Sequence, residues 1–233
     1  MPRLEKLVAA ASPHSRRAAA GLIKSGRVAV DGKTVTAPDY PCAQTAFITL
    51  DGAPLLLGPR YIMLNKPKGT ICATKDDNGK TVLELIAEPL RKNLFPAGRL
   101  DKDSEGFVLL TDDGPFAHRL LSPRSRIPKT YLATLDRPPD KDILAELFCS
   151  PIDLGGGDIT SPALLENVDG VTARLTIYEG MFHQVKRMFL KAGYKVEGLR
   201  RIRIGALELD PGLGPGEYRP ILPGEMPLLI RQD

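Results

Sequence analysis

The stretch from Asp101 to Asp112 carries side chains that could do one of two kinds of chemistry. Counted from Asp101, four residues fall close to the spacing of a calcium-binding EF-hand loop: Asp103, Glu105, Gly106 and Asp112. The same stretch also has Gly98-Arg99-Leu100-Asp101 before an apolar run, which is typical of a turn that delivers one carboxylate beside a strand. The first interpretation predicts a metal protein, and the second predicts a single Asp that either caps the turn or acts as a catalyst.

Details of the stretch weigh against calcium. The twelfth EF-hand ligand is usually a Glu that binds with both oxygens, whereas Asp112 is shorter, and Glu105 stands where Asp or Asn is usual. Two prolines and Gly98 would interrupt an incoming helix, and the apolar run from 107 to 110 is typical of a buried strand. We therefore expect a strand from 107 to 111 and no metal.

The elements that must position this carboxylate predict an α+β domain. Apolar runs indicate strands near residues 61–64, 107–111, 131–135, 173–178 and 199–204. Helical spacing indicates helices near 83–87 and 184–192. Strands and helices do not alternate regularly, which argues against a doubly wound parallel sheet.

A smaller domain is expected before it. Leu4, Leu7 and Val8 recur at helical spacing, and Ser15 can cap a second helix. Asp31-Gly32 then suits the tight turn of a β-hairpin. Glycines and prolines make 51–60 a plausible linker. We expect a small domain over residues 1–58 and a larger one over 59–233.

Composition narrows the class of protein. The chain has 233 residues, an apolar share of 42% and a net charge of +4, which is ordinary for a folded protein. Its three cysteines are widely separated, so the sequence indicates neither a disulfide framework nor a zinc site. No apolar stretch approaches the roughly 20 residues needed to cross a bilayer, and the first residues lack an export signal. We expect a soluble, cytoplasmic protein.

Four spaced segments, taken together, resemble the RNA pseudouridine synthases. The catalytic motif of that family is matched by residues 98–111, and its other motifs are matched by residues 61–69, 129–132 and 179–189. The N-terminal section resembles the S-four type RNA-binding module. The resemblance implies a helix-helix-hairpin RNA-binding domain, followed by a catalytic domain with a mixed, mainly antiparallel sheet.

The resemblance also implies a reaction and the residues for it. A uridine within RNA would be detached from its sugar, rotated and rejoined through carbon, with no cofactor or metal. Asp101 would be the catalytic aspartate, Tyr131 would lie against the target base, and Leu199 would be a late apolar pocket residue. Addition of Asp101 to the sugar or base, and removal of a sugar proton to give a glycal, both stay open.

Both routes need an ionised carboxylate in a partly dry pocket. Desolvation disfavours that charge, so a cation must lie nearby. The resemblance gives this role to Lys186, which the sequence places beside the apolar helix face of Val185, Met188 and Phe189.

Basic residues near these motifs predict contacts with RNA. On a regular strand Arg201 and Arg203 would project from one face together with Leu199, a pair suited to phosphates. For Arg187 a solvated helix face is an equal alternative, and His183 and Gln184 could read the substrate or cap the helix. The remaining expected contacts are Arg99, Arg124, Arg126, Lys129, Arg16, Arg17 and Lys24.

Within the family, residues 182–188 are closest to the branch that modifies small-subunit ribosomal RNA. The resemblance therefore implies 16S RNA as partner, free or in a partly assembled particle, with uridine 516 as the target and a monomeric enzyme. Large-subunit 23S RNA is the first alternative. A non-catalytic ribosome-assembly protein is the second, against which the presence of Asp101, Tyr131 and Lys186 speaks. Ser104 replaces a common Thr, and Glu105 adds a negative charge without an assigned role.

Overall fold

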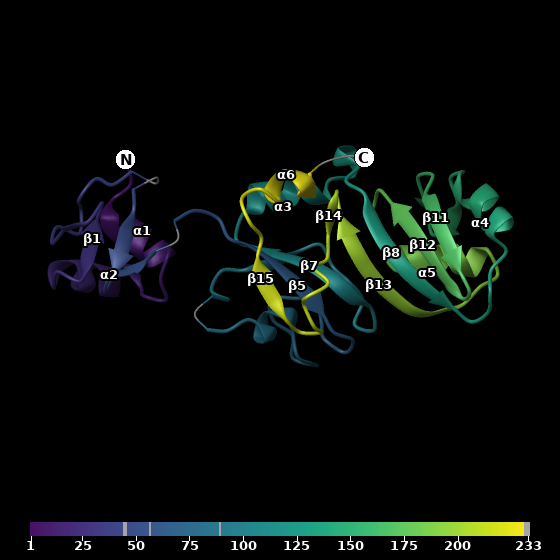
Figure 1. The fold of residues 1–233 in the computed structure, drawn as a ribbon, viewed down its shortest axis with the longest axis horizontal. Helices are drawn as coiled ribbons and strands as arrows, with labels where there is room; N and C mark the ends of the chain where they lie inside the picture. The colour runs from purple at the N-terminus through teal and green to yellow at the C-terminus, as the bar shows by residue number, and fades with distance from the viewer. Residues whose placement is uncertain (44–45, 56, 89, 231–233) are drawn as a thin grey trace. The chain divides into compact units, whose positions relative to one another are not determined.

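The computed structural model describes residues 1–43, 46–55, 57–88 and 90–230. Its residues group into two units by their contacts. The small unit consists of residues 1–59 with 87–92, and the large unit consists of residues 60–86 with 93–233. Figure 1 shows the elements of each unit along the chain. Among the described residues, no helix is long and apolar enough to cross a membrane.

The small unit contains two helices and a four-stranded sheet. Its elements are α1 (Leu4–Ala10), α2 (Arg16–Lys24), β1 (Val28–Val30), β2 (Lys33–Thr34), β3 (Ile48–Leu50) and β4 (Ala53–Pro54), with strand order β2-β1-β3-β4. Ser15 caps α2 as expected, because its side chain accepts a hydrogen bond from the Ala18 amide. Leu4, Val8 and Ile23 are fully buried between the helices and the sheet.

The expected linker at 51–60 is partly wrong. Residues 48–50 and 53–54 pair as the antiparallel strands β3 and β4. Asp51 and Gly52 form the turn with φ of 53° and 81°, just as Asp31 and Gly32 do with 49° and 79°. An Asp-Gly pair tolerates the positive φ that such a turn requires, so the same dipeptide builds both hairpins.

The large unit is built on a nine-stranded sheet. Its main path runs β11-β12-β8-β13-β7-β5-β15, and β14 and β6 pair with β13 and β7. Of the strand pairs described, β13 with β7 is the one parallel pair, so the expected mixed, mainly antiparallel α+β fold is confirmed. The strands are β5 (Tyr61–Lys66), β6 (Phe95–Ala97), β7 (Glu105–Thr111), β8 (Lys129–Leu135), β11 (Leu164–Asp169), β12 (Thr172–Ile177), β13 (Val196–Ile204), β14 (Leu207–Glu208) and β15 (Tyr218–Pro220).

Short helices and a separate hairpin complete the large unit. The helices are α3 (Gly114–Leu121), α4 (Lys141–Phe148), α5 (Gln184–Lys191), α6 (Met226–Leu229) and the 3₁₀ turns η1 (Val82–Leu85) and η2 (Pro123–Ser125), and the hairpin is β9 (Asp153–Gly155) with β10 (Asp158–Ile159). The helix expected near 83–87 is therefore one 3₁₀ turn, which ends before Ile86.

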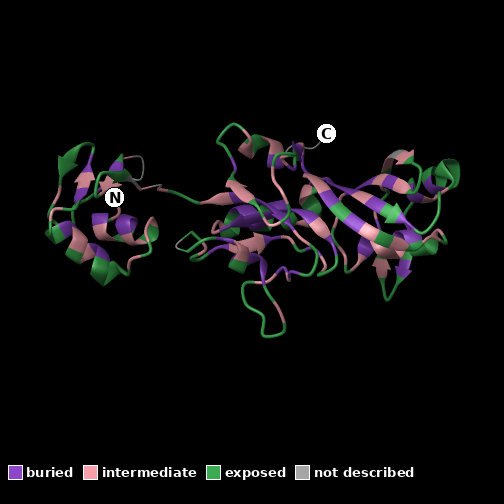
Figure 2. Cartoon of the chain, turned by 60° about the horizontal axis from the view of Figure 1, so that its bottom comes forward, coloured by how far each residue is buried: buried purple, intermediate pink, exposed green. Residues whose placement is uncertain are grey.

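The central strands are buried on both faces, which explains their unbroken apolar runs. In β5, Ile62 and Leu64 belong to one core cluster, whereas Met63 belongs to another. Successive side chains of a strand point to opposite faces, so the two clusters are the two sides of the sheet. Buried residues concentrate along these strands in Figure 2. Helix α5 contributes to the first cluster, and α3 contributes to the second.

Gly106 allows β13 to lie directly beside β7. Its φ is 101°, and a Cβ atom at this position would lie 2.2 Å from the Arg201 carbonyl oxygen. Only glycine avoids that clash and accepts this φ without strain. The parallel contact of Gly106 with Arg201 therefore brings the start of β7, just after Asp101, against the strand that carries Leu199.

Candidate active site

Asp101 lies in the turn between β6 and β7. The turn begins at Gly98, whose φ is 95°, as expected for a turn glycine. Leu100 is buried in the core, and the next residue, Asp101, keeps a quarter of its side chain exposed. The Ser104 amide donates to the Asp101 carbonyl over 3.1 Å, which closes the turn.

The backbone of this turn is held from its buried side by Lys66. This lysine, the last residue of β5, is fully buried. Its Nζ donates to the carbonyl oxygens of Ser104 at 2.6 Å, Pro67 at 3.2 Å and Lys102 at 3.3 Å. Burial lowers the pKa of Lys66 below its ordinary value. One ammonium group thus ties the end of β5 to residues 102–104.

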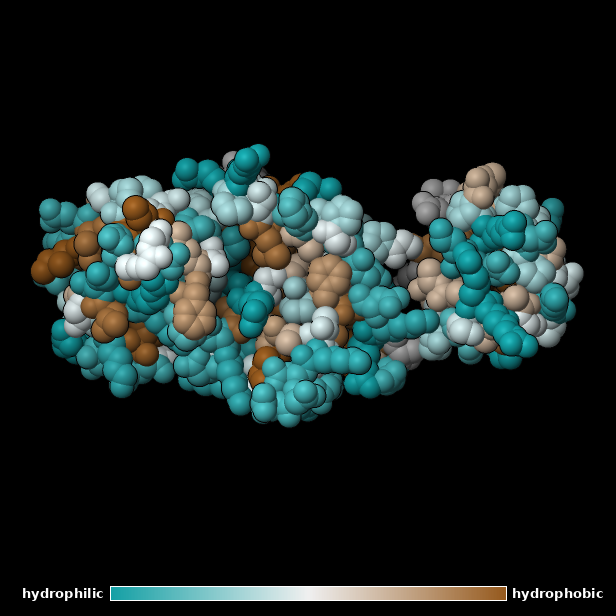
Figure 3. Space-filling view, turned by 180° about the vertical axis from the view of Figure 1, so that it is seen from behind, coloured by the Kyte–Doolittle hydropathy of each residue, from teal (hydrophilic) through white to brown (hydrophobic). Residues whose placement is uncertain are grey.

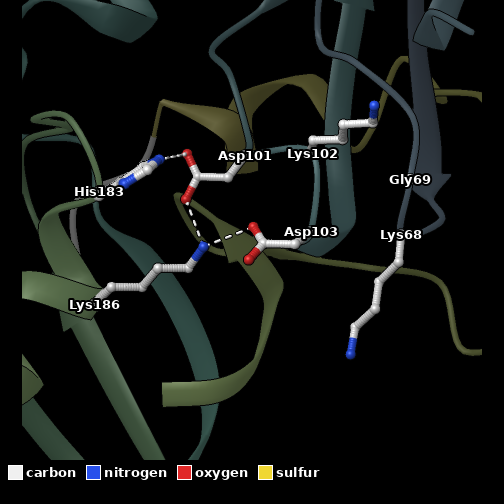
Figure 4. Close-up of a pocket in the computed structure, with 7 residues that line it drawn as sticks. All are labelled: Lys68, Gly69, Asp101, Lys102, Asp103, His183 and Lys186. Carbon is white, nitrogen blue, oxygen red and sulfur yellow. Dashed lines mark hydrogen bonds and ion pairs between the residues drawn. The ribbon is translucent and has the colours of Figure 1, made fainter. Parts of the chain in front are cut away.

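On the exposed side of the turn, Asp101 contacts two cationic or potentially cationic side chains. One carboxylate oxygen lies 3.1 Å from Lys186 Nζ, and the other lies 3.3 Å from His183 Nε2. Lys186 Nζ also donates to Asp103 Oδ1 over 2.6 Å. Figure 4 shows Lys186 lying between the two carboxylates, with His183 on the far side of Asp101. The expected pairing of Asp101 with a lysine is present in this geometry.

The charges of Lys186 and Asp103 stabilise each other. Burial lowers the pKa of Lys186, but hydrogen bonds to Asp103 and Asp101 outweigh it, so this pKa is raised above the ordinary lysine value. The hydrogen bond from Lys186 holds the pKa of Asp103 below its ordinary value. Lys186 therefore stays cationic and Asp103 anionic at neutral pH.

Helix α5 carries Lys186 to this position. His183 precedes the helix with φ of 49° and ψ of 32°, a left-handed conformation that is uncommon for a non-glycine residue. Gln184 is buried, its Oε1 accepts from the Met181 amide at 3.0 Å, and its Nε2 donates to Glu179. Gln184 thus fixes the start of the helix, whereas His183 presents its ring to Asp101.

These side chains face an open hollow of about 560 Å³. It is lined by Lys68, Gly69, Asp101, Lys102, Asp103, His183 and Lys186. Lys68 and Lys102 are exposed, and within the described part of the chain neither forms an ion pair. The hollow therefore combines two carboxylates that share Lys186 with two further cations that are open to an anionic ligand.

Tyr131 lies in the core rather than on the wall of the hollow. Its side chain is 6% exposed, and it packs in the same cluster as Leu100 and Val185, the apolar neighbours of Asp101 and Lys186. Arg201 Nη1 donates to the Tyr131 hydroxyl over 3.4 Å, and Arg201 Nε donates to the Phe107 carbonyl at 2.7 Å. In the residues described, Arg201 Nη2 is buried without a hydrogen-bond partner.

Comparison with known proteins identifies this arrangement. The model of the family described as RNA pseudouridylate synthase matches residues 60–191, and the S4 domain model matches residues 2–47. The chain belongs to the RNA pseudouridine synthase family. It is therefore an isomerase that acts on RNA, as the sequence motifs indicated, and an S4 domain precedes the synthase region.

This pseudouridine synthase is similar to known proteins over nearly its whole length. "Ribosomal small subunit pseudouridine synthase A" of Escherichia coli strain K12 is 45% identical over 231 residues, covering 98% of this chain and 100% of that protein. "Uncharacterized RNA pseudouridine synthase YtzG" of Bacillus subtilis is 42% identical and covers 97% and 98%. A solved structure described as "Crystal structure of pseudouridylate synthase" is 39% identical, has a TM-score of 0.70, and covers 98% of this chain and all of that one.

The prediction that Arg201 and Arg203 project from one face of β13 is wrong. The pairing of β13 with β8 shifts by one residue, so that Arg201 lies opposite Tyr131 and Arg203 lies opposite Thr130. Adjacent residues of β8 point to opposite faces, so this bulge separates the two guanidinium groups. Arg201 is buried beside Tyr131, and Arg203 binds Thr130 and Glu166 on the other face.

Three further residues that were expected to contact RNA, namely Lys129, Arg187 and Gln184, bind other parts of the protein. Lys129 is buried, and its Nζ donates to the Ile127 carbonyl at 3.0 Å. Burial and then the charge of Arg201 lower the pKa of Lys129 to about 8. Arg187 forms an ion pair with Asp158 and donates to three backbone carbonyls, so it braces the β9-β10 hairpin. Neither residue lines the hollow, and neither does Gln184.

The other expected contacts lie at the surface or in the core. Leu199 is buried in the cluster that contains Tyr131. Five arginines and one lysine are exposed, three of them in the large unit and three in the small unit: Arg99, Arg124, Arg126, Arg16, Arg17 and Lys24. Of these, Arg99, Arg124 and Arg126 belong to the same unit as the hollow and do not line it.

Sequence reasoning missed three charged residues of the hollow, namely Lys68, Lys102 and Asp103. Each lies within or next to a motif that the sequence analysis used. Lys68 belongs to the matched segment 61–69, and Lys102 and Asp103 directly follow Asp101. The acidic spacing drew attention to Asp103 as a calcium ligand, whereas its partner is Lys186. Asp112 lies at the other end of β7, where it binds Arg60, so the acidic side chains do not converge.

Proposed function

We propose that this pseudouridine synthase modifies 16S ribosomal RNA of the small subunit, with uridine 516 as its target. The proposal is supported by the name of relatives that are 45% identical over nearly the whole chain. We further propose that it acts in the cytoplasm as a monomer, on free RNA or on a partly assembled particle. Its S4 domain would bind RNA through exposed residues of α2, namely Arg16, Arg17 and Lys24.

The observation that carries the catalytic assignment is the position of Asp101. It is the carboxylate of the hollow that contacts both Lys186 and His183. The Asp103 side chain is 74% exposed, and of Lys186 and His183 it contacts only Lys186. Asp103 is therefore less desolvated than Asp101. A catalytic carboxylate needs a fixed position and a nearby cation in a partly dry site, and Asp101 has both.

The proposed chemistry begins with an ionised Asp101. A uridine in structured RNA must be flipped out of its stack to enter the hollow. Asp101 then either adds to the nucleotide or removes a sugar proton, and in both routes the bond between base and sugar breaks. The freed uracil rotates and is rejoined to the sugar through carbon 5, which then gives up its proton while N1 takes one up. Asp101 is released from its bond in the first route, and it returns the sugar proton in the second. Lys186 stays charged throughout and stabilises the carboxylate at the start and the end of the cycle.

We assign the remaining groups by their place around this centre. Lys68 and Lys102 would bind phosphates of the strand, because both are exposed and unpaired in the described structure. Tyr131, held by Arg201, and Leu199 do not line the hollow, so the target base would contact them only by reaching the core cluster that also contains Leu100 and Val185. We retain the division at residues 58 and 59 between the RNA-binding domain and the catalytic domain as part of this proposal.

Site-resolved mapping of pseudouridine tests the substrate. Ribosomal RNA would be mapped in cells that have the gene, in cells that lack it, and in cells complemented with the wild-type gene. We expect loss of one pseudouridine from 16S RNA and its return on complementation. Loss from 23S RNA alone would refute the choice of substrate, and no loss from any RNA would favour a non-catalytic assembly protein.

A further inference from the structure

Phe182 is an exposed aromatic ring at the edge of the hollow. Its relative exposure is 75%, although it stands two residues before the buried Gln184, which begins α5. Its ring stacks on the ring of His183, with centroids 3.8 Å apart and planes 18° apart. His183 in turn lies 3.3 Å from Asp101. A stack of two rings therefore begins at the proposed catalytic carboxylate and ends in solvent.

The backbone under this stack is bound firmly. Arg187 Nη1 donates to the Phe182 carbonyl at 3.0 Å, and the same guanidinium is anchored by Asp158. Gln184 accepts from the Met181 amide on the other side of Phe182. The left-handed conformation of His183 turns the chain so that the two rings lie together. The ring of Phe182 is thus held in place before any ligand arrives, which lowers the entropy lost on binding.

Other exposed apolar side chains of the large unit differ from Phe182. Figure 3 shows such groups gathered at the end of the unit that carries α4, α5 and β11, where Leu190, Ile143 and Leu164 are more than half exposed. Single exposed apolar residues are ordinary on protein surfaces. None of these three is aromatic, whereas Phe182 is stacked on a side chain that contacts Asp101.

We propose that the outer face of Phe182 stacks on an RNA base next to the uridine that enters the hollow. This inference rests on the proposed function, in which Asp101 acts on a flipped-out uridine. Extrusion of that uridine removes a stacking partner from its neighbours, and an aromatic ring replaces this partner. Every base has a π face, so the contact positions the strand without reading its sequence. Lys68 and Lys102, across the same hollow, supply charge for the backbone of that strand.

Phe182→Ala tests this positioning role on purified full-length enzyme. Turnover is measured on deproteinised 16S and 23S RNA from cells that lack the gene, at whichever uridine the wild-type enzyme converts. We expect KM to rise roughly 5- to 150-fold, which corresponds to about 1–3 kcal/mol of stacking per base, while kcat changes little. Phe182→Tyr should restore the wild-type KM, because it keeps the ring. Leu190→Ala, on another exposed side chain, in α5, is the matched control and should change neither parameter.

Fluorescence quenching tests for stacking directly, because it would not depend on Phe182 if that residue only supported the fold. RNA hairpins carry 2-aminopurine on the 5′ or the 3′ side of the converted uridine, and binding is followed with Asp101→Asn enzyme to prevent turnover. We expect quenching at one of the two positions, lost in the Phe182→Ala background and kept with Phe182→Tyr. Wild-type KM and unchanged quenching in Phe182→Ala would overturn the inference.

The same measurements separate this inference from the proposed function. If the wild-type enzyme converts a uridine of 23S RNA instead, the substrate proposal fails, and the Phe182 comparison is decided at that uridine. If wild type converts no uridine in either RNA, deproteinised or in partly assembled ribosomal particles from the same cells, both proposals are overturned. A rise of KM in Phe182→Ala with loss of thermal stability and without rescue by Phe182→Tyr would also contradict a stacking role.

Discussion

Two lysines hold the same turn from its two sides, and they differ in what they bind. Lys66 is fully buried, and its ammonium donates to three backbone carbonyls. Lys186 keeps about a fifth of its side chain exposed and binds the carboxylates of Asp101 and Asp103. The first contact fixes the backbone, and the second lies where a substrate can reach it.

The different partners of Lys66 and Lys186 indicate different roles, one in positioning the turn and one in the proposed reaction. Carbonyl oxygens carry no net charge, so Lys66 remains a buried cation whose pKa is lowered by burial. Carboxylates are full charges, and they raise the pKa of Lys186 despite its partial burial. A cation that serves the fold is therefore enclosed by dipoles, whereas a cation that serves the reaction is paired with ionisable groups in an open hollow.

The largest effect on stability should come from the buried side of the turn. Lys66→Met removes the donor of the buried Ser104 carbonyl, whereas the Lys102 carbonyl keeps the Gly69 amide and the Pro67 carbonyl keeps the Thr70 hydroxyl. We expect the free energy of unfolding to fall by about 1–3 kcal/mol, the cost of one unsatisfied buried acceptor. Urea unfolding measures it. Lys68→Met, two residues along and exposed, is the control, and equal stability of the two variants would break the comparison.

The open side should affect turnover rather than stability. Lys186→Met removes the cation beside Asp101, and we expect kcat to fall on the order of 10²–10³-fold, as for loss of a preorganised electrostatic group. The unfolding free energy should change by about 1 kcal/mol or less, since the pair is partly exposed. Lys186→Arg keeps the charge and should recover part of the rate. A variant that lost stability as Lys66→Met does would contradict the distinction.

Lys129 sharpens the comparison, because it is buried but has one carbonyl acceptor in the described structure instead of three. Its pKa of about 8, against an ordinary 10.5, means that the unfolded chain binds more protons between these values. Wild-type stability from this group therefore rises with pH from about 8 to 10.5. We expect Lys129→Met to stabilise the protein by about 1–3 kcal/mol below pH 8.

Urea unfolding across the pH range checks that window. The gain from Lys129→Met should shrink as pH rises from 8 and disappear near 10.5. A destabilised variant at pH 7, or a gain that does not depend on pH, would show that Lys129 is stabilised in the way proposed for Lys66.

The smallest effect is expected at Lys68, which lines the hollow without an ion pair in the described structure. Lys68→Ala should weaken RNA binding a few-fold and reduce the slope of log affinity against log salt by about one unit. Unfolding should be unaffected. An unchanged salt slope would exclude a phosphate contact at this position.

Much of the fold could be predicted because the signals are local. The runs Ile62–Leu64 and Phe107–Leu110 are apolar on both faces, and they indeed form the two central strands β5 and β7. The start of α5 at Gln184 also followed from its spacing. Helix α3 was missed, because Gly114 and Pro115 at its start are typical of a turn, and its signal is the cap at Asp113.

The candidate site was predicted only in part, because its geometry depends on contacts between distant strands. Alternation along β13 placed Arg201 and Arg203 on one face, and a single-residue bulge against β8 separates them. Lys66 lies beyond the strand expected at 61–64, yet it is the last residue of β5 and is fully buried. Glu105 pairs in register with Arg200 at the start of β7, and its charge is one of those that oppose the lowering of the Lys66 pKa by burial.

Turnover by Asp101→Asn and Asp103→Asn, side by side on the same ribosomal RNA, tests the central claim most directly. Both substitutions remove one negative charge next to Lys186 and keep the size of the side chain. The account predicts no detectable pseudouridine from Asp101→Asn and a rate within about tenfold of wild type from Asp103→Asn. Formation of pseudouridine by Asp101→Asn at the wild-type rate would contradict it.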